Sequence, residues 1–519
     1  MLQRDEVNLE DIDREKIYLN YLNYILCILY MMKVKNGYKI EKNGWKYISI
    51  KGNPYERGYA HGQLLSKEIK EAINMLRFSL YDSHGVPIDF FIEISNFFYK
   101  SVTEESFPEI MEELRGITDG ANKHGANITL DEVILWNNAA SIDYPMSKLS
   151  EYLKDMPELE KKYSNILGSV SSGAQEGGAR DKCSAFIAVG DYTKDGKICC
   201  AHNSFDNFME GQYFNCIIDV NPTNGNRIMY QGAPGYISSQ TDFFVTSAGI
   251  IGTETTIGGF TSYKKGYPIT CRIRQAMQYG KTLDDYVNIL TTNNSGDYAN
   301  SWLFGNIKTN EIMRIELGLE FVNVERTKNG YFIGFNAAYD PRIRNLECVN
   351  TGFDDIRRHQ GARKVRLEQL MVENKGKIDI NVAKEIIADH YDVYLNKINP
   401  CSRTCCSHYD LDDRAFMSQA DRPLPYQPRG AVDGAVCDST LAKNMSFMAR
   451  WGSSCGTPFD KDDFINRNLQ WKRFGPYLHD RPSEPWTHFK IGEIEGKYES
   501  RRYTKINNKK NRKLRTLKK

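Results

Sequence analysis

Residues 182–205 read KCSAFIAVGDYTKDGKICCAHNSF, and this stretch contains the features that predict the fold. Ser184–Gly190 is a short apolar run, Asp195-Gly196 is a turn signal, and Lys197–Ala201 is the returning apolar run. Two such runs joined by such a turn predict a β-hairpin. Cys183 opens the hairpin and follows residues 148–182, which are charged, then Gly/Ser/Ala-rich, with little to bury. We interpret residues 148–182 as a flexible linker or excisable propeptide segment.

A chain cut between Lys182 and Cys183 would carry a thiol and a free α-amine on one residue. The α-amine has an ordinary pKa of roughly 7.7–8.0, near enough to neutrality for it to accept the proton of the thiol. This is the thiol version of an N-terminal threonine nucleophile. The alternative is that Cys183 is a small core residue, which is the commonest role of a lone cysteine.

The chain after the hairpin alternates between strand-like and helical patterns. Strand-like runs recur at 214–220, 227–231, 243–251, 302–306, 312–317 and 331–335, and helical patterns fit 272–279, 283–291, 362–374 and 382–390. Strands grouped with helices outside them indicate an α/β (α+β) protein built in layers. We therefore predict that residues 183–490 form the catalytic core and that 491–519 are a basic tail.

Residues 41–147 are predicted to be a mainly helical N-terminal part of the same protein. Pro54 suits the first turn of a helix. Gly58 and Gly62 lie four residues apart, so they share one helix face and permit close backbone packing.

Residues 1–40 are interpreted as an extension whose most apolar stretch runs from Ile17 to Met32. This stretch is short for a membrane-spanning helix, and no small-residue cleavage site follows it. We expect an amphipathic or buried helix, with an unusual signal-anchor as the alternative, and no firm transmembrane segment.

The length, composition and net charge of the chain limit its possible domain organisation and partners. A chain of 519 residues predicts one large or two closely joined domains. Hydrophobic residues make up 41% and charged residues 26%, as in ordinary soluble proteins. The net charge of +2 gives no reason to expect specific nucleic-acid binding, although the ten Lys and Arg residues in 501–519 could contact an anionic surface or form a solvated end.

Several motifs carry a resemblance to a known family. Cys183-Ser184-Ala185-Phe186, followed by Cys200-Ala201-His202-Asn203-Ser204-Phe205, resembles the phospholipase B-like family, which shows a Cys-Ser-Ala start and an Ala-His-Asn-Thr-Trp segment. Further matches follow in order at Ser239–Phe244 with Gly252–Ile257, at Tyr298–Trp302, more loosely at Pro400–Leu411, and at Gly430-Ala431-Val432-Asp433. The front end, Gly52–Gly62, is similar to the opening of isopenicillin-type acyltransferases. The resemblance implies an N-terminal-nucleophile (Ntn) hydrolase with a four-layer αββα sandwich, which cleaves its own Lys182–Cys183 bond.

The resemblance also implies roles for individual residues. Cys183 matches the nucleophile, His202 an active-site histidine and Asn300 an oxyanion-hole donor. His202 can alternatively be a hydrogen-bonded strand histidine. Thr253 and Arg363 are weaker matches, because Thr253 fits an ordinary strand residue and Arg363 lies on a basic helix face that is commonly solvated.

This chain departs from the family pattern at two places. Phe205 stands where the family usually has Trp, which leaves substrate selection open. Choloylglycine-type relatives carry Arg and Asp three residues apart near this point, whereas this chain has Asn203 and Asp206. Asp206 is therefore a candidate site residue whose role stays open.

The cysteines near residue 400 allow two interpretations. Cys401, Cys405, Cys406 and His408 could be zinc ligands, with Cys437 and Cys455 as the second pair that such sites usually need. The resemblance instead favours structural cysteines, with a disulfide in an oxidising compartment as one form. We expect neither a metal nor an organic cofactor.

Three functions compete. The first is a hydrolase of an acyl lipid or an N-acyl amide, as the resemblance implies. The second is an acyltransferase or amidase of the isopenicillin type, and the third is a non-enzymatic structural protein that retains the fold. The resemblance also implies a lysosomal or secreted glycoprotein, and sequons stand at Asn127, Asn293 and Asn444, although such short motifs arise by chance.

Overall fold

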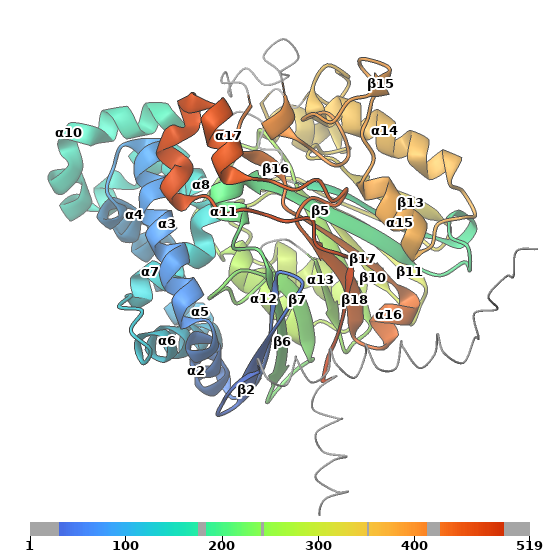
Figure 1. The fold of residues 1–519 in the computed structure, drawn as a ribbon. Coiled ribbons are helices and arrows are strands. Elements are labelled where there is room, and N and C mark those ends of the chain that lie inside the picture. Colours follow the sequence, from blue (N-terminus) through green and yellow to red (C-terminus); the bar gives the residue numbers. More distant parts are fainter. Residues whose placement is uncertain (1–30, 175–182, 240–242, 350–351, 413–425, 493–519) are drawn as a thin grey trace, which may run out of the picture.

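Two β-sheets lie face to face at the centre of the protein, and helices cover their outer faces (Figure 1). The structure is a computed structural model that describes residues 31–174, 183–239, 243–349, 352–412 and 426–492. Lys182, most of the apolar stretch from Ile17 to Met32 and nearly all of the basic tail therefore lie outside the described residues. Within them, no helix is long and apolar enough to cross a membrane.

The large sheet has β1 at one edge and β12 at the other. Its strands, in spatial order, are β1 (Met32–Val34), β2 (Gly37–Lys42), β3 (Trp45–Gly52), β6 (Cys216–Pro222), β7 (Ile228–Gly232), β8 (Phe243–Thr246), β9 (Ile250–Thr256), β10 (Asn300–Asn306), β11 (Glu311–Leu317) and β12 (Val322–Thr327). All neighbours pair antiparallel except β3 and β6, which are parallel.

The small sheet contains the predicted hairpin. Its strands, in order, are β13 (Gly330–Gly334), β4 (Cys183–Val189), β5 (Cys199–Asn207), β17 (Asp433–Asp438), β18 (Ser446–Trp451) and β19 (Thr487–Lys490), and β16 (Arg429–Ala431) pairs with the end of β5. A separate two-stranded ribbon is formed by β14 (Tyr391–Asp392) and β15 (Lys397–Ile398). The pairing of β4 with β5 confirms the predicted hairpin.

Helices complete the layers. The helices are α2 (Pro54–Leu64), α3 (Ser66–His84), α4 (Ile88–Ser95), α5 (Ser101–Ser106), α6 (Pro108–Asn122), α7 (Leu130–Asn138), α8 (Asp143–Ser147), α9 (Leu149–Tyr152), α10 (Pro157–Ala174), α11 (Phe208–Gly211), α12 (Ile269–Tyr279), α13 (Leu283–Thr291), α14 (His359–Glu373), α15 (Ile380–Ile387), α16 (Ser439–Lys443) and α17 (Lys461–Arg467). Helix α13 packs on β10 and β11, whereas α14 packs on β13 and α15 packs on β5 and β17. Strands β4 and β5 contact β9 of the opposite sheet. These contacts confirm the predicted four-layer αββα sandwich.

The side chains of the β4–β5 hairpin point alternately into two hydrophobic cores. Ala185, Ile187 and Val189 belong to the main core between the sheets. Phe186 and Ala188 belong to a second core beneath α14 and α15. Because successive strand side chains point to opposite faces, Cys183 lies on the face of Ala185, towards the large sheet.

The predicted close packing around Gly58 and Gly62 is confirmed. A Cβ atom on Gly58 would lie 2.1 Å from the carbonyl oxygen of Glu113, and one on Gly62 would lie 2.1 Å from that of Ile117. Gly116 and Gly120 of α6 face α2 with equally little space. Only glycines therefore allow α2 and α6 to approach this closely.

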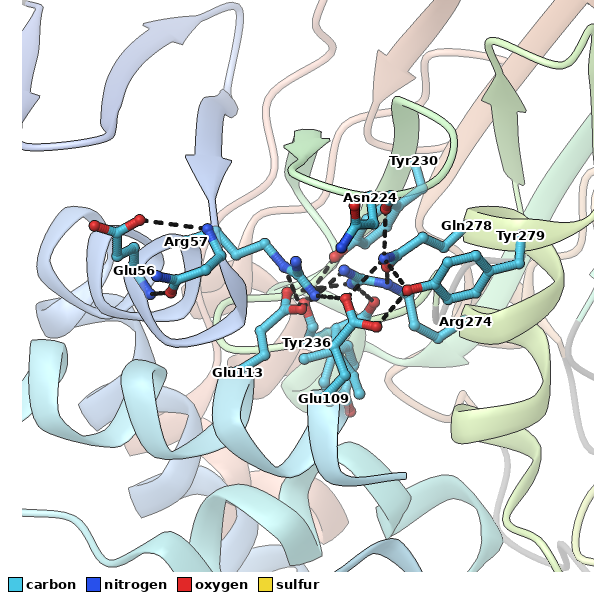
Figure 2. A network of polar contacts seen from close by, with 12 residues as sticks. Glu56, Arg57, Glu109, Glu113, Asn224, Tyr230, Tyr236, Arg274, Gln278 and Tyr279 are labelled. Atoms are coloured by element: carbon cyan, nitrogen blue, oxygen red, sulfur yellow. Dashed lines mark hydrogen bonds and ion pairs between the residues drawn. The ribbon is translucent and has the colours of Figure 1, made fainter. Parts of the chain in front are cut away.

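A buried ionic network, the Glu113 network, ties these helices to the core (Figure 2). Glu113 of α6 accepts hydrogen bonds from Arg57 of α2 at 2.6 Å and from Arg274 of α12 at 2.8 Å. Arg274 also donates to the carbonyl of Ile237 at 2.6 Å. The N-terminal helices and the sandwich are thus joined by paired, buried charges.

Two sequence boundaries differ from the structure. The sequence predicts that residues 1–40 are an extension. In the structure, β1 and most of β2 fall within this range and form one edge of the large sheet. The expectation that residues 148–182 have little to bury is wrong for their first half. There α9 and α10 bury Leu149, Leu159 and Tyr163 against the helical layer.

Candidate active site

Cys183 is the first residue of β4, and its main chain is held on both sides. The side chain is 3% exposed. Its peptide nitrogen donates to Asn336 Oδ1 at 3.3 Å, and its carbonyl accepts a hydrogen bond from Arg363 Nη1. The nitrogen and carbonyl that flank the thiol therefore have fixed positions.

Arg363 and Asn336 form one buried unit around Cys183. Arg363 comes from α14, is fully buried, and donates from Nη2 to Asn336 Oδ1 at 2.8 Å. Asn336 donates to the carbonyl of Thr256, at the end of β9, at 2.8 Å. Its φ of 67° lies in the left-handed region, which asparagine tolerates better than most residues. The alternative interpretation of Arg363, as a solvated residue on a basic helix face, is wrong, since Arg363 is buried where α14 packs on the small sheet.

A polar row crosses the small sheet beside the thiol. Cys183 lies opposite Ser204 of β5. Ser204 donates its peptide N–H to Asp433 Oδ1 at 2.9 Å, and Gln231 of the large sheet donates to Asp433 Oδ2 at 2.8 Å. Burial raises the pKa of Asp433 to about 7, because the carboxylate loses its hydration. A group that titrates near neutrality thus lies two strands from the thiol.

His202 occupies the next inward position on β5. It pairs with Ala185 and Ala435, whose small side chains leave room for the imidazole. The ring faces the main chain of Glu254 in β9, yet neither ring nitrogen has a hydrogen-bond partner of good geometry within the described residues. Burial lowers the pKa of His202 to about 3, so the imidazole is neutral. A neutral imidazole here can orient a polar group by hydrogen bonding.

The family of the chain follows from comparison with known proteins. Residues 36–480 match the family model described as phospholipase B. The chain belongs to the phospholipase B family.

Individual relatives are distant. An uncharacterized protein of Archaeoglobus fulgidus is 25% identical over 54% of this chain and 46% of its own length, so the chain spans less than half of that relative. A putative phospholipase B-like 2 of Rattus norvegicus is 22% identical over 80% of this chain and 78% of its own length. Phospholipase B of Crotalus adamanteus is 24% identical over 44% of this chain and 43% of its own length.

Solved structures are similar only over parts of the chain. A variant of conjugated bile acid hydrolase from Clostridium perfringens aligns with a TM-score of 0.30 and 11% identity, over 51% of this chain and 89% of that protein. Penicillin V acylase from Agrobacterium tumefaciens aligns with a TM-score of 0.27 and 11% identity, over 52% and 83%. The four-layer architecture rests on the sheet order and packing of this phospholipase B-family chain itself.

Thr253 and Asn300 lie on opposite faces of the large sheet in this family member. Thr255 lies against Gly334 of β13, so strand alternation places Thr253 on the face towards the small sheet. Asn300 lies opposite Thr256 and shares the face of Trp302. Both side chains are buried, and neither has a hydrogen-bond partner in the part of the chain that the structure describes. Asn300 is at the strand end where Asn336 binds the carbonyl of Thr256.

Asp206 lies further along the same face of β5 as His202 and Ser204. It faces Gly430 of β16, and its Oδ1 is 3.7 Å from Arg429 Nη1. The structure thus brings Cys183, His202 and Asp206 to one face of the small sheet and Arg363 to the edge beside Cys183. Asn300 is joined to this group only through the end of β9.

Sequence reasoning missed two residues of this site. Asn336 follows the predicted strand 331–335, and Asp433 closes the Gly430–Asp433 motif, but the sequence alone indicates a role for neither. An asparagine directly after a strand and an aspartate within an apolar run were the available signals. Their importance depends on strand register, which brings them to Cys183 from positions 153 and 250 residues away.

Proposed function

We propose that this phospholipase B-family hydrolase is an Ntn hydrolase whose nucleophile is the thiol of Cys183, exposed by cleavage of the Lys182–Cys183 bond. The observation that carries the proposal is the double anchoring of Cys183. Asn336 holds the peptide nitrogen that would become the α-amine, and Arg363 holds the carbonyl on the other side. Buried main-chain groups are nearly always hydrogen-bonded, but those of a strand residue are ordinarily paired with a neighbouring strand, whereas here two buried side chains bind them.

Maturation would begin with attack of the Cys183 thiol on the carbonyl carbon of Lys182. The C–N bond then breaks, a thioester forms, and the nitrogen of Cys183 takes up the thiol proton as a free amine. Water hydrolyses the thioester, which releases the carboxylate of Lys182 and returns the thiol. On this proposal residues 148–182 contain the excisable segment and 183–490 form the catalytic core.

Turnover would use the new amine as the general base. The amine, positioned by Asn336, accepts the thiol proton, and the thiolate attacks an acyl ester or amide carbonyl of a lipid or N-acyl amide. The protonated amine then returns the proton to the leaving alcohol or amine, and water hydrolyses the acyl-enzyme.

The remaining residues would bind and orient the substrate. The Asn300 amide, at the N-terminal end of β10 opposite Thr256, whose carbonyl Asn336 binds, is the proposed oxyanion donor; its position at this strand end, its burial and its lack of a partner within the described residues support this role. The neutral imidazole of His202 and the Thr253 hydroxyl would orient the substrate or the amine, and Asp206 would border the site. Removing an oxyanion donor lowers kcat by about 10²–10³ in comparable enzymes, so Asn300→Ala should lose activity on that scale.

The decisive experiment is intact mass with N-terminal sequencing of the full chain, fresh and after days at mildly acidic pH. We expect a fragment that begins Cys183-Ser184-Ala185, and we expect Cys183→Ala to remain uncut and inactive. Cys199→Ala, a buried cysteine on the other face of the hairpin, should be cut like the wild type. Cleavage of Cys183→Ala at the same bond would falsify the proposal.

A substrate screen of the cut enzyme then separates the chemical classes. Acyl esters of phospholipids and N-acyl amides are offered with and without an added amine acceptor. Free fatty or carboxylic acid as the product supports hydrolysis. Transfer of the acyl group to the added amine would instead assign the second function, acyl transfer.

A further inference from the structure

A second cluster of reactive side chains lies on the outer side of the small sheet. His390, Cys406, His408 and Cys455 each offer one ligand atom, and these four atoms lie within 4.8 Å of one another. From this geometry we propose that these four residues bind a zinc ion. The site is separate from the reaction proposed for Cys183.

The distances match the edges of a tetrahedral zinc site. Cys406 Sγ is 3.5 Å and Cys455 Sγ is 3.4 Å from His408 Nε2. With Zn–S bonds near 2.3 Å and Zn–N bonds near 2.0–2.1 Å, a tetrahedron places sulfur and nitrogen about 3.6 Å apart. The side chains are therefore already arranged as around a shared ion.

The surroundings supply the outer contacts that zinc ligands usually have. His408 Nδ1 lies 3.3 Å from Asp410 Oδ1, which directs Nε2 towards the two sulfurs. The peptide N–H of Thr457 donates to Cys455 Sγ at 3.4 Å, which favours a thiolate. His390 Nε2 is buried, close to Cys455, and has no hydrogen-bond partner of good geometry among the described residues, as expected of an atom that would bind a metal.

The ligand atoms indicate which metal the site binds and whether the metal is structural or catalytic. Two sulfur and two nitrogen donors in a tetrahedron are typical of zinc. Four protein ligands leave no open position, so the ion would be structural. The ligands come from three loops: the one after α15, the one that holds residues 401–412, and the one after β18. An ion would therefore cross-link loop segments that contain few helices or strands.

The site also supports the residues around Cys183. Cys406 packs with Phe205 and Ala431 in a small buried cluster, and Cys455 lies against it. The Arg363 guanidinium lies 5.1 Å from the centre of the Phe205 ring. Loss of the ion would therefore loosen the packing that supports Arg363.

Sequence reasoning considered zinc here with a different ligand set and expected no metal. Cys401 Sγ instead lies 3.5 Å from Asp392 Oδ2, Cys405 belongs to the core beneath α14 and α15, and Cys437 faces the main core. No disulfide joins the cysteines of the described residues. His390 was not identified, because it lies 16 residues before Cys406 without a recognisable ligand spacing.

The test uses the full chain with Cys183→Ala, so that the proposed nucleophile cannot bind metal. The protein is purified with a phosphine reductant, passed over a chelating resin, and analysed by inductively coupled plasma mass spectrometry. We expect close to one equivalent of zinc. Exchange for Co(II) should give the visible bands of a tetrahedral ion and a thiolate charge-transfer band.

Variants assign the ligands. Cys455→Ser and His390→Gln should lower zinc content at least about tenfold, and Asp410→Asn should weaken binding about 10-fold or more. Cys401→Ser is the matched control and should keep the zinc. Metal-free protein whose Cys406 and Cys455 react with iodoacetamide in the folded state would overturn the proposal. So would a Cys406–Cys455 disulfide in non-reduced peptide maps, or full zinc retention in the double variant Cys455→Ser/His390→Gln.

Discussion

Two buried polar regions of this protein differ in how completely their atoms are paired. In the Glu113 network, Arg57, Glu113 and Arg274 are almost fully buried, and their charges are matched by short hydrogen bonds. On the facing surfaces of the two sheets, His202, Ser204 and Thr253 are equally buried. Their side-chain polar atoms have no hydrogen-bond partner of good geometry within the described residues.

On the proposed function, the difference separates a structural region from the region that would bind substrate. Burying a polar group without a partner costs about 1–3 kcal/mol, so folded proteins keep few such groups. Where several lie together beside an anchored thiol, a bound substrate is the natural partner. The charges of the Glu113 network need no further partner. The network stabilises the protein by attaching the N-terminal helices to the sandwich.

The largest effect is expected from breaking the paired region. Glu113→Gln removes the charge that two buried arginines share, and loss of one member of a buried pair costs about 3–5 kcal/mol. We expect the free energy of unfolding to fall by that amount, measured by urea denaturation, with unchanged activity per folded molecule. Glu112→Gln, an exposed neighbour 3.8 Å from Arg115, is the control and should change stability by less than about 1 kcal/mol. Equal effects of the two variants would show that the network is not a structural unit.

The two regions also differ in how far sequence predicts them. The close approach at Gly58 and Gly62 and the hairpin after Cys183 follow from local spacing and turn chemistry. The inward face shared by Cys183 and His202 follows from strand alternation once the hairpin register is known. Asn336, Asp433, Glu113 and Arg274 could not be placed, because long-range pairing brings them to their partners. Burial of Arg363 likewise depends on which face of α14 meets the small sheet.

A second effect, smaller within any one pH unit and with a pH signature, is expected at Asp433. Its pKa is about 7 in the folded protein because of burial, against an ordinary 3.8. The folded state therefore holds one more proton than the unfolded state between pH about 4 and about 7. The free energy of unfolding should fall with rising pH across this window, by up to about 1.4 kcal/mol per pH unit from this group. Asp433→Asn should remove that slope, measured by urea denaturation at several pH values.

The Asp433 prediction has a control variant and an outcome that would contradict it. Asp354→Asn, at an exposed position, should keep the wild-type slope. If Asp433→Asn follows the wild-type slope as well, the carboxylate is ionised in the folded protein at low pH. It would then resemble the charged members of the Glu113 network, and Asp433 would not titrate near neutrality beside Cys183.

The smallest expected effect separates the two regions most directly. Thr253→Val deletes a buried hydroxyl that has no partner in the described part of the chain, whereas Thr270→Val deletes one that donates to the carbonyl of Asn137 at 3.0 Å. Both changes preserve shape, so the difference reports the hydrogen bond. Thr253→Val should leave the free energy of unfolding unchanged or raise it by up to about 1 kcal/mol, whereas Thr270→Val should lower it by about 1 kcal/mol because Asn137 loses a donor. Activity should fall only in Thr253→Val if that hydroxyl contacts the substrate. A loss of stability in Thr253→Val as large as in Thr270→Val would mean that the Thr253 hydroxyl has a partner in solution, and the facing surfaces of the sheets would then be as fully paired as the Glu113 network.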